Sequence, residues 1–175
     1  VSDTTGCASV ATVLITQPGI LNTAIIGTED VTCYGSCNGS ASLTASGGIA
    51  PYTFLWNDSL AQTTATATAL AGGSYNATVT DSAGCTTIIS ITINEPSVIL
   101  ISLTSLPASC GIPNGSALAA VTGGTGAFTY LWSPYGGTSN SATGLTAGTY
   151  TVNVTDSSAC SSSAGIAVPN SGGPA

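Results

Sequence analysis

The chain has 175 residues, seven acidic side chains and no lysine, arginine or histidine, so its net charge is −7. Without cations it cannot neutralise phosphates, which excludes nucleic-acid binding, and an anionic membrane surface would repel it. No segment approaches the roughly 20 apolar residues that a membrane-spanning helix needs. Trypsin-like proteases find no site to cut, and six cysteines point to an oxidising, extracellular setting.

The chain repeats itself, beginning with its first residues. VSDTTGC at the N-terminus returns as VTDSAGC and VTDSSAC, and each copy is followed by an alternating segment that ends in a proline. The period is about 75–78 residues, which is typical of an array of small domains. We therefore expect a segment of a longer array. Its parts are the end of a preceding repeat (1–18), two complete repeats (19–96 and 97–169) and a linker stub (170–175).

Inside each repeat the local signals are those of β-strands. The stretch YTFLW alternates so that Tyr52, Phe54 and Trp56 share one face, and SYNATVTD and TIISITIN alternate in the same way. Glycine pairs and Asn-Gly or Asp-Ser turns separate the strands. The pattern predicts an all-β protein of tandem Ig-like sandwiches, arranged as beads on a string, with seven strands in each repeat. Its expected structural core residues are Trp56, Trp132, Tyr75 and Tyr150.

Two aromatic features have alternative interpretations. A recurring tryptophan is also what a sugar-stacking platform would use, but its alternation with polar residues in both repeats favours the core. LAGGSY at 70–75 and LTAGTY at 145–150 resemble the tyrosine corner of such sandwiches, in which the hydroxyl binds a nearby backbone group.

The order of motifs resembles one repeat family closely. It runs C-x-G-x-C-N-G-S, then GG-x-x-PYTF-x-W, then L-x-x-G-x-Y-x-x-T-V-T-D-x-x-GC, and ends with a strand and a proline. This order is similar to the SprB-type repeat, a PKD-like Ig module of Bacteroidota cell-surface adhesins exported by type IX secretion. The likeness covers about 150 residues. It implies an extracellular adhesin segment on the cell surface.

Catalytic and metal-binding patterns are missing from the sequence. Without histidine or lysine, the common nucleophile–base pairs cannot form. Asp3, Asp81 and Asp156 occupy one turn position in three repeats, as Asx-turn residues do. Cys33 and Cys37 lack the second ligand pair that zinc needs, and the Glu29–Asp30 pair is a weaker candidate for calcium than for a solvated loop. We expect no enzyme activity, no cofactor and no metal.

Several serines, threonines and asparagines are candidates for glycosylation. Ser59, Ser82 and Thr4 follow aspartates in sequences that resemble the O-glycosylation sites of Bacteroidota secreted proteins. Sugars at predicted turns would cover strand edges that lack the usual lysines. N-x-S/T sequons, which also arise by chance in a chain this rich in serine and threonine, begin at Asn38, Asn57, Asn76, Asn114 and Asn153.

The cysteines offer more than one pairing. Cys33 and Cys110 are expected at one end of their sandwiches, and Cys85 and Cys160 at the other end, about 20 Å away, which is beyond disulfide reach. In a head-to-tail string, Cys160 could instead bridge Cys33 or Cys37 of the preceding repeat, and this is the pairing we favour. A local Cys33–Cys37 bridge is the competing arrangement. Cys7, Cys85 and Cys110 would then have partners elsewhere in the array or in neighbouring copies.

Two functions fit these observations. The first is a structural and adhesive stalk or filament, protease-resistant and glycosylated, whose partners are neighbouring repeats or copies of itself, with no nucleic acid and no membrane insertion. The second is an Ig-like module that binds surface glycans through exposed loop aromatics, for which Tyr34 and Tyr135 are the candidates, although each fits a packed loop anchor better. We expect the first function.

Overall fold

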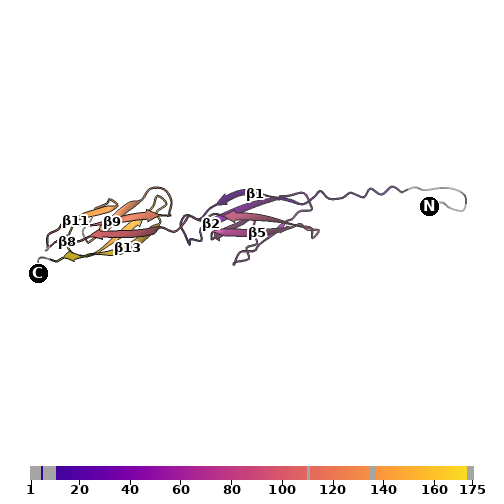
Figure 1. Ribbon diagram of the computed structural model, residues 1–175. Helices are drawn as coiled ribbons and strands as arrows, with labels where there is room; N and C mark the ends of the chain where they lie inside the picture. Colours follow the sequence, from indigo (N-terminus) through magenta and orange to yellow (C-terminus); the bar gives the residue numbers. More distant parts are fainter. Residues whose placement is uncertain (1–4, 6–10, 110, 135–136, 173–175) are drawn as a thin grey trace.

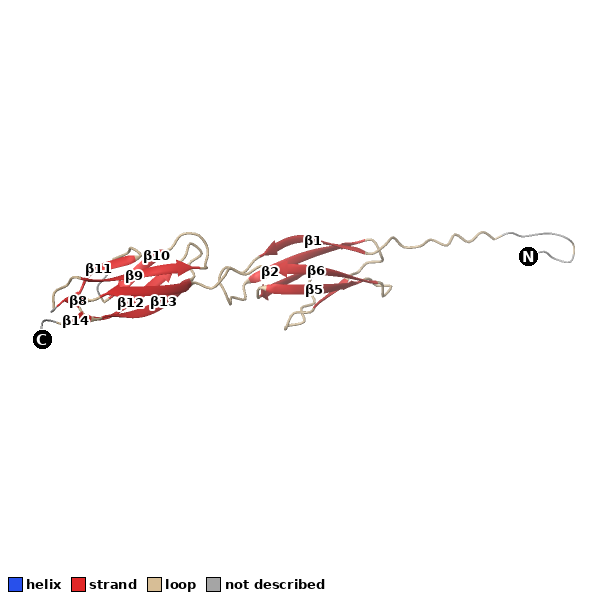
Figure 2. Ribbon diagram, viewed as in Figure 1, coloured by secondary structure: helices blue, strands red, loops and turns tan. Residues whose placement is uncertain are grey.

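Two elongated β-sandwiches lie end to end in the computed structural model, preceded by an extended segment (Figure 1). The structure describes residues 5, 11–109, 111–134 and 137–172. All regular structure in these residues is strand or turn, with no helix (Figure 2). The expectation of an all-β chain built from tandem Ig-like sandwiches is therefore confirmed.

The first sandwich consists of two antiparallel three-stranded sheets. One has the order β1-β2-β4 and the other the order β3-β5-β6. Glycine-rich turns and alternating apolar residues separate and orient these strands, as period-2 patterns require. The strands are β1 (Asn22–Glu29), β2 (Gly39–Ser46), β3 (Thr53–Trp56), β4 (Thr66–Leu70), β5 (Gly73–Thr80) and β6 (Thr86–Ile93).

The second sandwich repeats this arrangement with sheets β11-β9-β7 and β10-β12-β13. Its outer strands β7 and β13 come close enough for the Ser105 hydroxyl to donate to the Ala167 carbonyl at 2.9 Å. The strands are β7 (Leu100–Leu106), β8 (Ala108–Ser109), β9 (Gly115–Thr122), β10 (Thr129–Ser133), β11 (Ser141–Leu145), β12 (Gly148–Thr155), β13 (Ser161–Val168) and β14 (Asn170–Ser171).

The expectation of seven strands in each repeat was wrong. The sheets match the A-B-E and C-F-G sets of an Ig sandwich, and no strand D is present in the described residues. In the first repeat, the chain between β3 and β4 forms a turn because the Asp58 carboxylate accepts the N–H groups of Leu60 and Gln62, at 3.1 and 3.0 Å. Backbone donors satisfied in this way have no need of a neighbouring strand.

Two residues of the segment expected to be a linker stub pair with a strand of the second sandwich. Asn170 and Ser171 form β14, which pairs in parallel with β8, and the Ser171 hydroxyl donates to the Ala108 carbonyl at 3.1 Å. The described structure of this repeat therefore continues two residues past Pro169.

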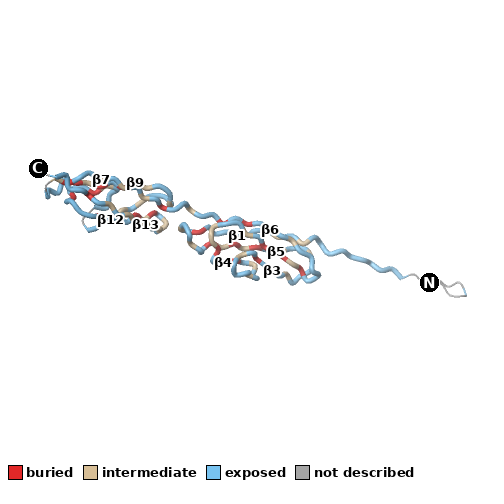
Figure 3. Tube along the Cα trace, turned by 60° about the horizontal axis from the view of Figure 1, so that its bottom comes forward, coloured by how far each residue is buried: buried red, intermediate tan, exposed pale blue. Residues whose placement is uncertain are grey.

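Each sandwich has its own buried core (Figure 3), and each core includes the tryptophan of that repeat. Trp56 and Trp132 are only 1% and 3% exposed, so neither ring offers a face to a sugar. The indole N–H groups donate to the carbonyls of Thr64 and Ser139, which satisfies their only polar atom. Tyr75 and Tyr150 form tyrosine corners, and their hydroxyls donate to the carbonyls of the residues four positions earlier, at 3.1 and 3.0 Å.

Residues 11–16 run as an extended segment away from both sandwiches (Figure 1), and the chain reaches the first sandwich at Gly19, whose carbonyl accepts the Gly48 N–H. Val13 and Ile15 are 78% and 91% exposed. The corresponding residues of the first repeat, Ile91 and Ile93, are 2% and 1% exposed inside β6. The segment thus has the apolar pattern of a last strand, but no sheet lies against it in this structure.

Candidate functional site at the junction between the repeats

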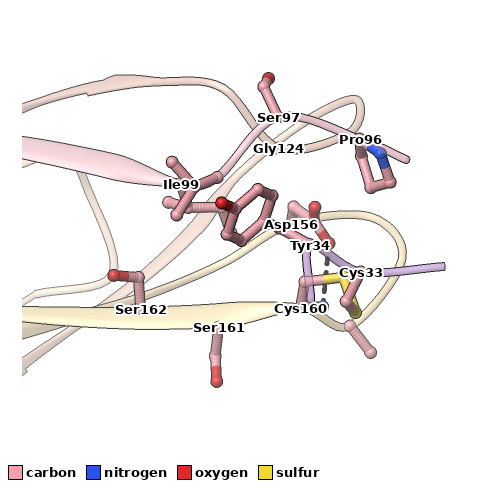
Figure 4. A pocket seen from close by; sticks show the side chains of 12 residues that line it. Cys33, Tyr34, Pro96, Ser97, Ile99, Gly124, Asp156, Cys160, Ser161 and Ser162 are labelled. Carbon is pink, nitrogen blue, oxygen red and sulfur yellow. Dashed lines mark hydrogen bonds between the residues drawn. A yellow bond between two sulfur atoms is a disulfide. The ribbon is translucent and has the colours of Figure 1, made fainter. Parts of the chain in front are cut away.

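A disulfide between Cys33 and Cys160 links the two sandwiches covalently (Figure 4). Cys33 lies in the loop between β1 and β2, and Cys160 lies in the hairpin between β12 and β13. Their Cα atoms are 5.6 Å apart, which is ordinary for a disulfide. The structure therefore contains the cross-repeat pairing, and the local alternative is not formed because Cys37 is unpaired.

Asp156 holds the hairpin that presents Cys160. One carboxylate oxygen accepts the N–H groups of Ser158 and Cys160, both at 2.9 Å, and the other accepts the Thr125 N–H at 2.8 Å. Burial alone would raise the pKa of Asp156, but these backbone donors outweigh it and hold the pKa below its ordinary value. The aspartate is thus a turn-forming anion whose oxygens are already occupied.

The loop that presents Cys33 is anchored to the strand end just before the inter-repeat linker. The Asp30 carboxylate accepts the backbone N–H and the side-chain amide of Asn94, at 2.7 and 2.9 Å. The side-chain amide, and after it the backbone N–H, lower the pKa of Asp30. At the loop tip, the Glu95 carboxylate accepts the Gly35 N–H. Glu29 binds the Ser40 hydroxyl, so the two adjacent acids are used separately by the protein itself.

A cavity of about 290 Å³ lies beside the disulfide, and both repeats line it. The Tyr34 ring reaches into this cavity, which Ile99 and Asp156 also line (Figure 4). Pro96 and Ser97 of the linker form another wall. Although Tyr34 is 61% exposed, it lies at the contact between the repeats. Tyr135, the other loop aromatic singled out from the sequence, lies outside the described residues.

The sequence contains four further cysteines, two of which lie in the described residues. Cys37 and Cys85 are exposed free thiols. Cys7 and Cys110 lie outside the described residues, so their predicted partners remain predictions. The geometry therefore accounts for one of the expected bridges and leaves Cys85 unpaired at the opposite end of the first sandwich.

The glycosylation candidates lie on the surface. Ser59 and Ser82 are exposed at turns, but the Ser82 hydroxyl donates to the carbonyls of Ile49 and Ala50, at 2.9 and 3.1 Å. Thr4 lies outside the described residues. The five sequon asparagines are all exposed, namely Asn38, Asn57, Asn76, Asn114 and Asn153.

The residues at the junction form a structural connection between the two repeats. Among the described residues, no three cysteine or acidic side chains come close enough together to hold a metal ion. A search of the same residues finds no helix with the length and hydropathy needed to cross a membrane. The cavity walls offer hydroxyl groups, backbone and one fully hydrogen-bonded carboxylate, so what the site does chemically is to link two domains.

Tandem Ig-like sandwiches of this kind define a modular repeat protein. The SprB repeat family matches residues 26–61 and 102–137, once in each sandwich, and each match contains the tryptophan strand. The SprB model therefore matches once in each repeat, which confirms the resemblance seen in the sequence. SprB repeats occur in cell-surface proteins, which indicates an extracellular, adhesin-like repeat. No curated protein matches the chain in sequence.

Solved structures show distant likenesses. A C-terminal intimin fragment in complex with the intimin-binding domain of its translocated receptor has 15% identity and a TM-score of 0.43, over 90% of this chain and 66% of that one. The eight N-terminal Ig domains of Down Syndrome Cell Adhesion Molecule have 11% identity and a TM-score of 0.43, over 87% of this chain and 25% of that one. The S-layer protein rSbsC has 18% identity and a TM-score of 0.38, over 90% of this chain and 28% of that one. The chain thus spans less than two thirds of the first two, and its fold is defined by its own strand order.

Proposed function

We propose that this chain is a load-bearing segment of a long extracellular surface protein or filament. The observation that carries the proposal is the Cys33–Cys160 disulfide between consecutive repeats. Domains joined only by a short linker move relative to one another by default. Here the six residues between β6 and β7 run alongside a covalent bond, so the two sandwiches are connected twice at one junction.

The disulfide changes how tension travels through the chain. Force applied at the two ends enters the first repeat before Cys33 and leaves the second repeat after Cys160. The bond carries that force directly, so the stretch between the cysteines, residues 34–159, stays out of the load path. That stretch contains every strand except β1, β13 and β14. Both tryptophan cores therefore keep most of their strands under load.

The surface suits an exposed extracellular position. The chain has no lysine or arginine, so it contains no residue after which a trypsin-like protease cleaves. Apolar side chains such as Ile26, Ile88 and Leu131 are 61–67% exposed on the sheets. Uncharged strands with exposed apolar residues tend to aggregate unless something covers them. O-linked sugars at Ser59 and Ser82 are our proposed cover, and intact masses of peptides carrying these serines from the native protein test it.

A stalk function needs no cleft, whereas the glycan-binding alternative depends on the loop aromatics Tyr34 and Tyr135, of which only Tyr34 lies in the described residues. A glycan-binding module would need an exposed loop aromatic, but Tyr34 lies in the junction cavity. Catalysis lacks histidine, lysine and arginine altogether. The proposed partners are neighbouring repeats or copies of the same chain, and adhesion would come from reach and multiplicity. Export by type IX secretion is part of this proposal.

Small-angle X-ray scattering tests whether the junction is stiff. The oxidised chain should give a narrow distribution of distances between the two sandwiches. Cys160→Ser should broaden this distribution towards shorter distances, because the linker then bends freely. Cys85→Ser, which removes an exposed and unpaired thiol, is the matched control and should leave the scattering unchanged. Identical curves for the oxidised protein and Cys160→Ser would overturn the proposal.

A further inference from the structure

The far end of the first sandwich contains a second version of the junction cavity. This second cavity has a volume of about 330 Å³ and is lined by residues 17–21, Gly48, Asp81, Ala83, Cys85 and Thr86. In the second repeat, the residues at corresponding positions, among them Gly124, Asp156 and Cys160, line the cavity beside the disulfide. We call this second cavity the Cys85 socket.

The same hydrogen bonds build both cavities. One oxygen of Asp81 accepts the N–H groups of Ala83 and Cys85, at 2.9 and 2.8 Å, and the other accepts the Ile49 N–H at 2.9 Å. These three bonds reproduce those of Asp156 in the second repeat. The Gly48 N–H donates to the Gly19 carbonyl at 2.9 Å, as the Gly124 N–H does to the Ser97 carbonyl. The backbone therefore presents Cys85 in the way that it presents Cys160.

The two cavities differ in what covers them. The Cys33–Tyr34 loop of the preceding repeat lies against the second sandwich, where Val98 is 41% exposed and Ile99 is 7% exposed. At the corresponding positions of the Cys85 socket, Ile20 is 82% exposed and Leu21 is only half-buried. Cys85 is a free, exposed thiol. The socket thus has the walls of the occupied site but no loop in it.

We infer that the Cys85 socket binds the loop that follows the first strand of another SprB repeat and forms a disulfide with it. The occupant is a Cys-Tyr-Gly loop of the kind seen at residues 33–35, because Cys33 and Tyr34 of that loop line the equivalent cavity and Cys33 is bonded to Cys160 there. The inference rests on the proposed stalk and extends it. Loop and socket lie at opposite ends of a sandwich, so the contact is head-to-tail and adds repeats in a line.

The bond needs an external oxidant. The Cys85 thiol and the loop thiol together lose two protons and two electrons. A small disulfide such as glutathione disulfide accepts them and leaves as two thiols. Thiol–disulfide exchange gives the same product in two steps, in which a thiolate first attacks one sulfur of the small disulfide and the second protein thiolate then displaces the remaining thiol.

The test measures whether the socket recognises the loop or merely exposes a thiol. The protein carries Cys7→Ser, Cys37→Ser and Cys110→Ser, so that Cys85 is its only free cysteine. The probe is the peptide DVTCYGSSNGS, which is residues 30–40 with Cys37→Ser, activated as a mixed disulfide with thionitrobenzoate. When the Cys85 thiolate attacks the peptide sulfur, the thionitrobenzoate thiolate leaves, and its absorbance reports the rate.

We expect the native peptide to react at least ~10-fold faster than a scrambled peptide carrying the same activated cysteine, since docking raises the local concentration of the reacting sulfur. The advantage should shrink when the peptide carries Tyr34→Ala, and also when the protein carries Ile20→Ser, whose exposed side chain is not needed for folding. In denaturant the two peptides should react equally.

Equal rates for native and scrambled peptides on the folded protein would overturn the inference, since Cys85 would then be an ordinary surface thiol. This outcome is separable from failure of the proposed function. The scattering comparison depends on Cys160 and not on Cys85. Failure of the peptide test alone would therefore overturn the socket and leave the stalk proposal in place. Failure of the scattering test alone would overturn the stalk proposal without bearing on whether Cys85 recognises the loop.

Discussion

Cys33 and Cys160 are 127 residues apart in sequence, yet their Cα atoms lie 5.6 Å apart across the junction of two domains. Each is presented by a loop with its own internal support. Asp30 and Glu95 anchor the loop of Cys33, and Asp156 builds the hairpin of Cys160. The bond therefore joins two loops that are each held by hydrogen bonds within their own repeat.

Loss of the disulfide should lower stability as well as stiffness. Cys160→Ser should reduce the free energy of unfolding by about 2–5 kcal/mol, because a long closed loop no longer restricts the unfolded chain. Urea denaturation followed by tryptophan fluorescence measures this difference. Cys85→Ser is the control and should match the unmodified protein. A Cys160→Ser variant as stable as that control would show that the bond contributes nothing to folding.

The cores should depend on their tryptophans. Trp56→Ala should destabilise the first sandwich by about 3–5 kcal/mol, because a large, fully buried side chain leaves a cavity and an unpaired Thr64 carbonyl. Its neighbour Leu55 is 52% exposed on the opposite face, and Leu55→Ala should cost far less. Thermal unfolding by circular dichroism compares the two variants, and similar losses for both would contradict the described core.

Stability should fall in acid, and the direction follows from the aspartates. Hydrogen bonds hold the pKa values of Asp30, Asp58, Asp81 and Asp156 below the ordinary value of 3.8. Because the pKa of each of these carboxylates is lower in the folded chain, the unfolded chain binds protons at a higher pH than the folded chain does as the pH falls. The stabilisation is therefore complete above about pH 5 and is lost as the pH falls below 3.8 through the lowered values.

Melting temperatures measured between pH 2 and pH 7 check this dependence. Asp156→Asn should lower the melting temperature at neutral pH and flatten its fall in acid, since one of the linked groups is gone. Glu29→Gln removes the same charge from an exposed strand residue and is the matched control. A profile for Asp156→Asn as steep as that of the control would show that this carboxylate is not among the groups that link stability to pH.

The features that could be predicted from the sequence are those that arise from local or repeated patterns of residues. The alternation around Trp56 and Trp132, the spacing before Tyr75 and Tyr150 and the repeated Asp-Ser turns all recur at one period, so the Ig-like class followed from them. The two ends of a sandwich are too far apart for a disulfide within one repeat, so a bridge at the junction between repeats was the favoured expectation. No such local rule specifies contacts between loops that are distant in sequence.

Three features could not be predicted for that reason. The missing strand D depends on Asp58 satisfying its own turn, which competes with a strand only in the folded context. The pairing of β14 with β8 joins segments 62 residues apart. The entry of Tyr34 into the junction cavity arises only where the two sandwiches meet.

Single-molecule force spectroscopy tests the central claim most directly. With the chain pulled from its two ends, the oxidised protein should hold back the chain between Cys33 and Cys160, which are separated by 127 residue steps, and reduction should release it as about 420–460 Å of additional length. The reduced protein should also show two full unfolding events, one for each sandwich. Equal extension before and after reduction would contradict the account, because the disulfide would then carry no load.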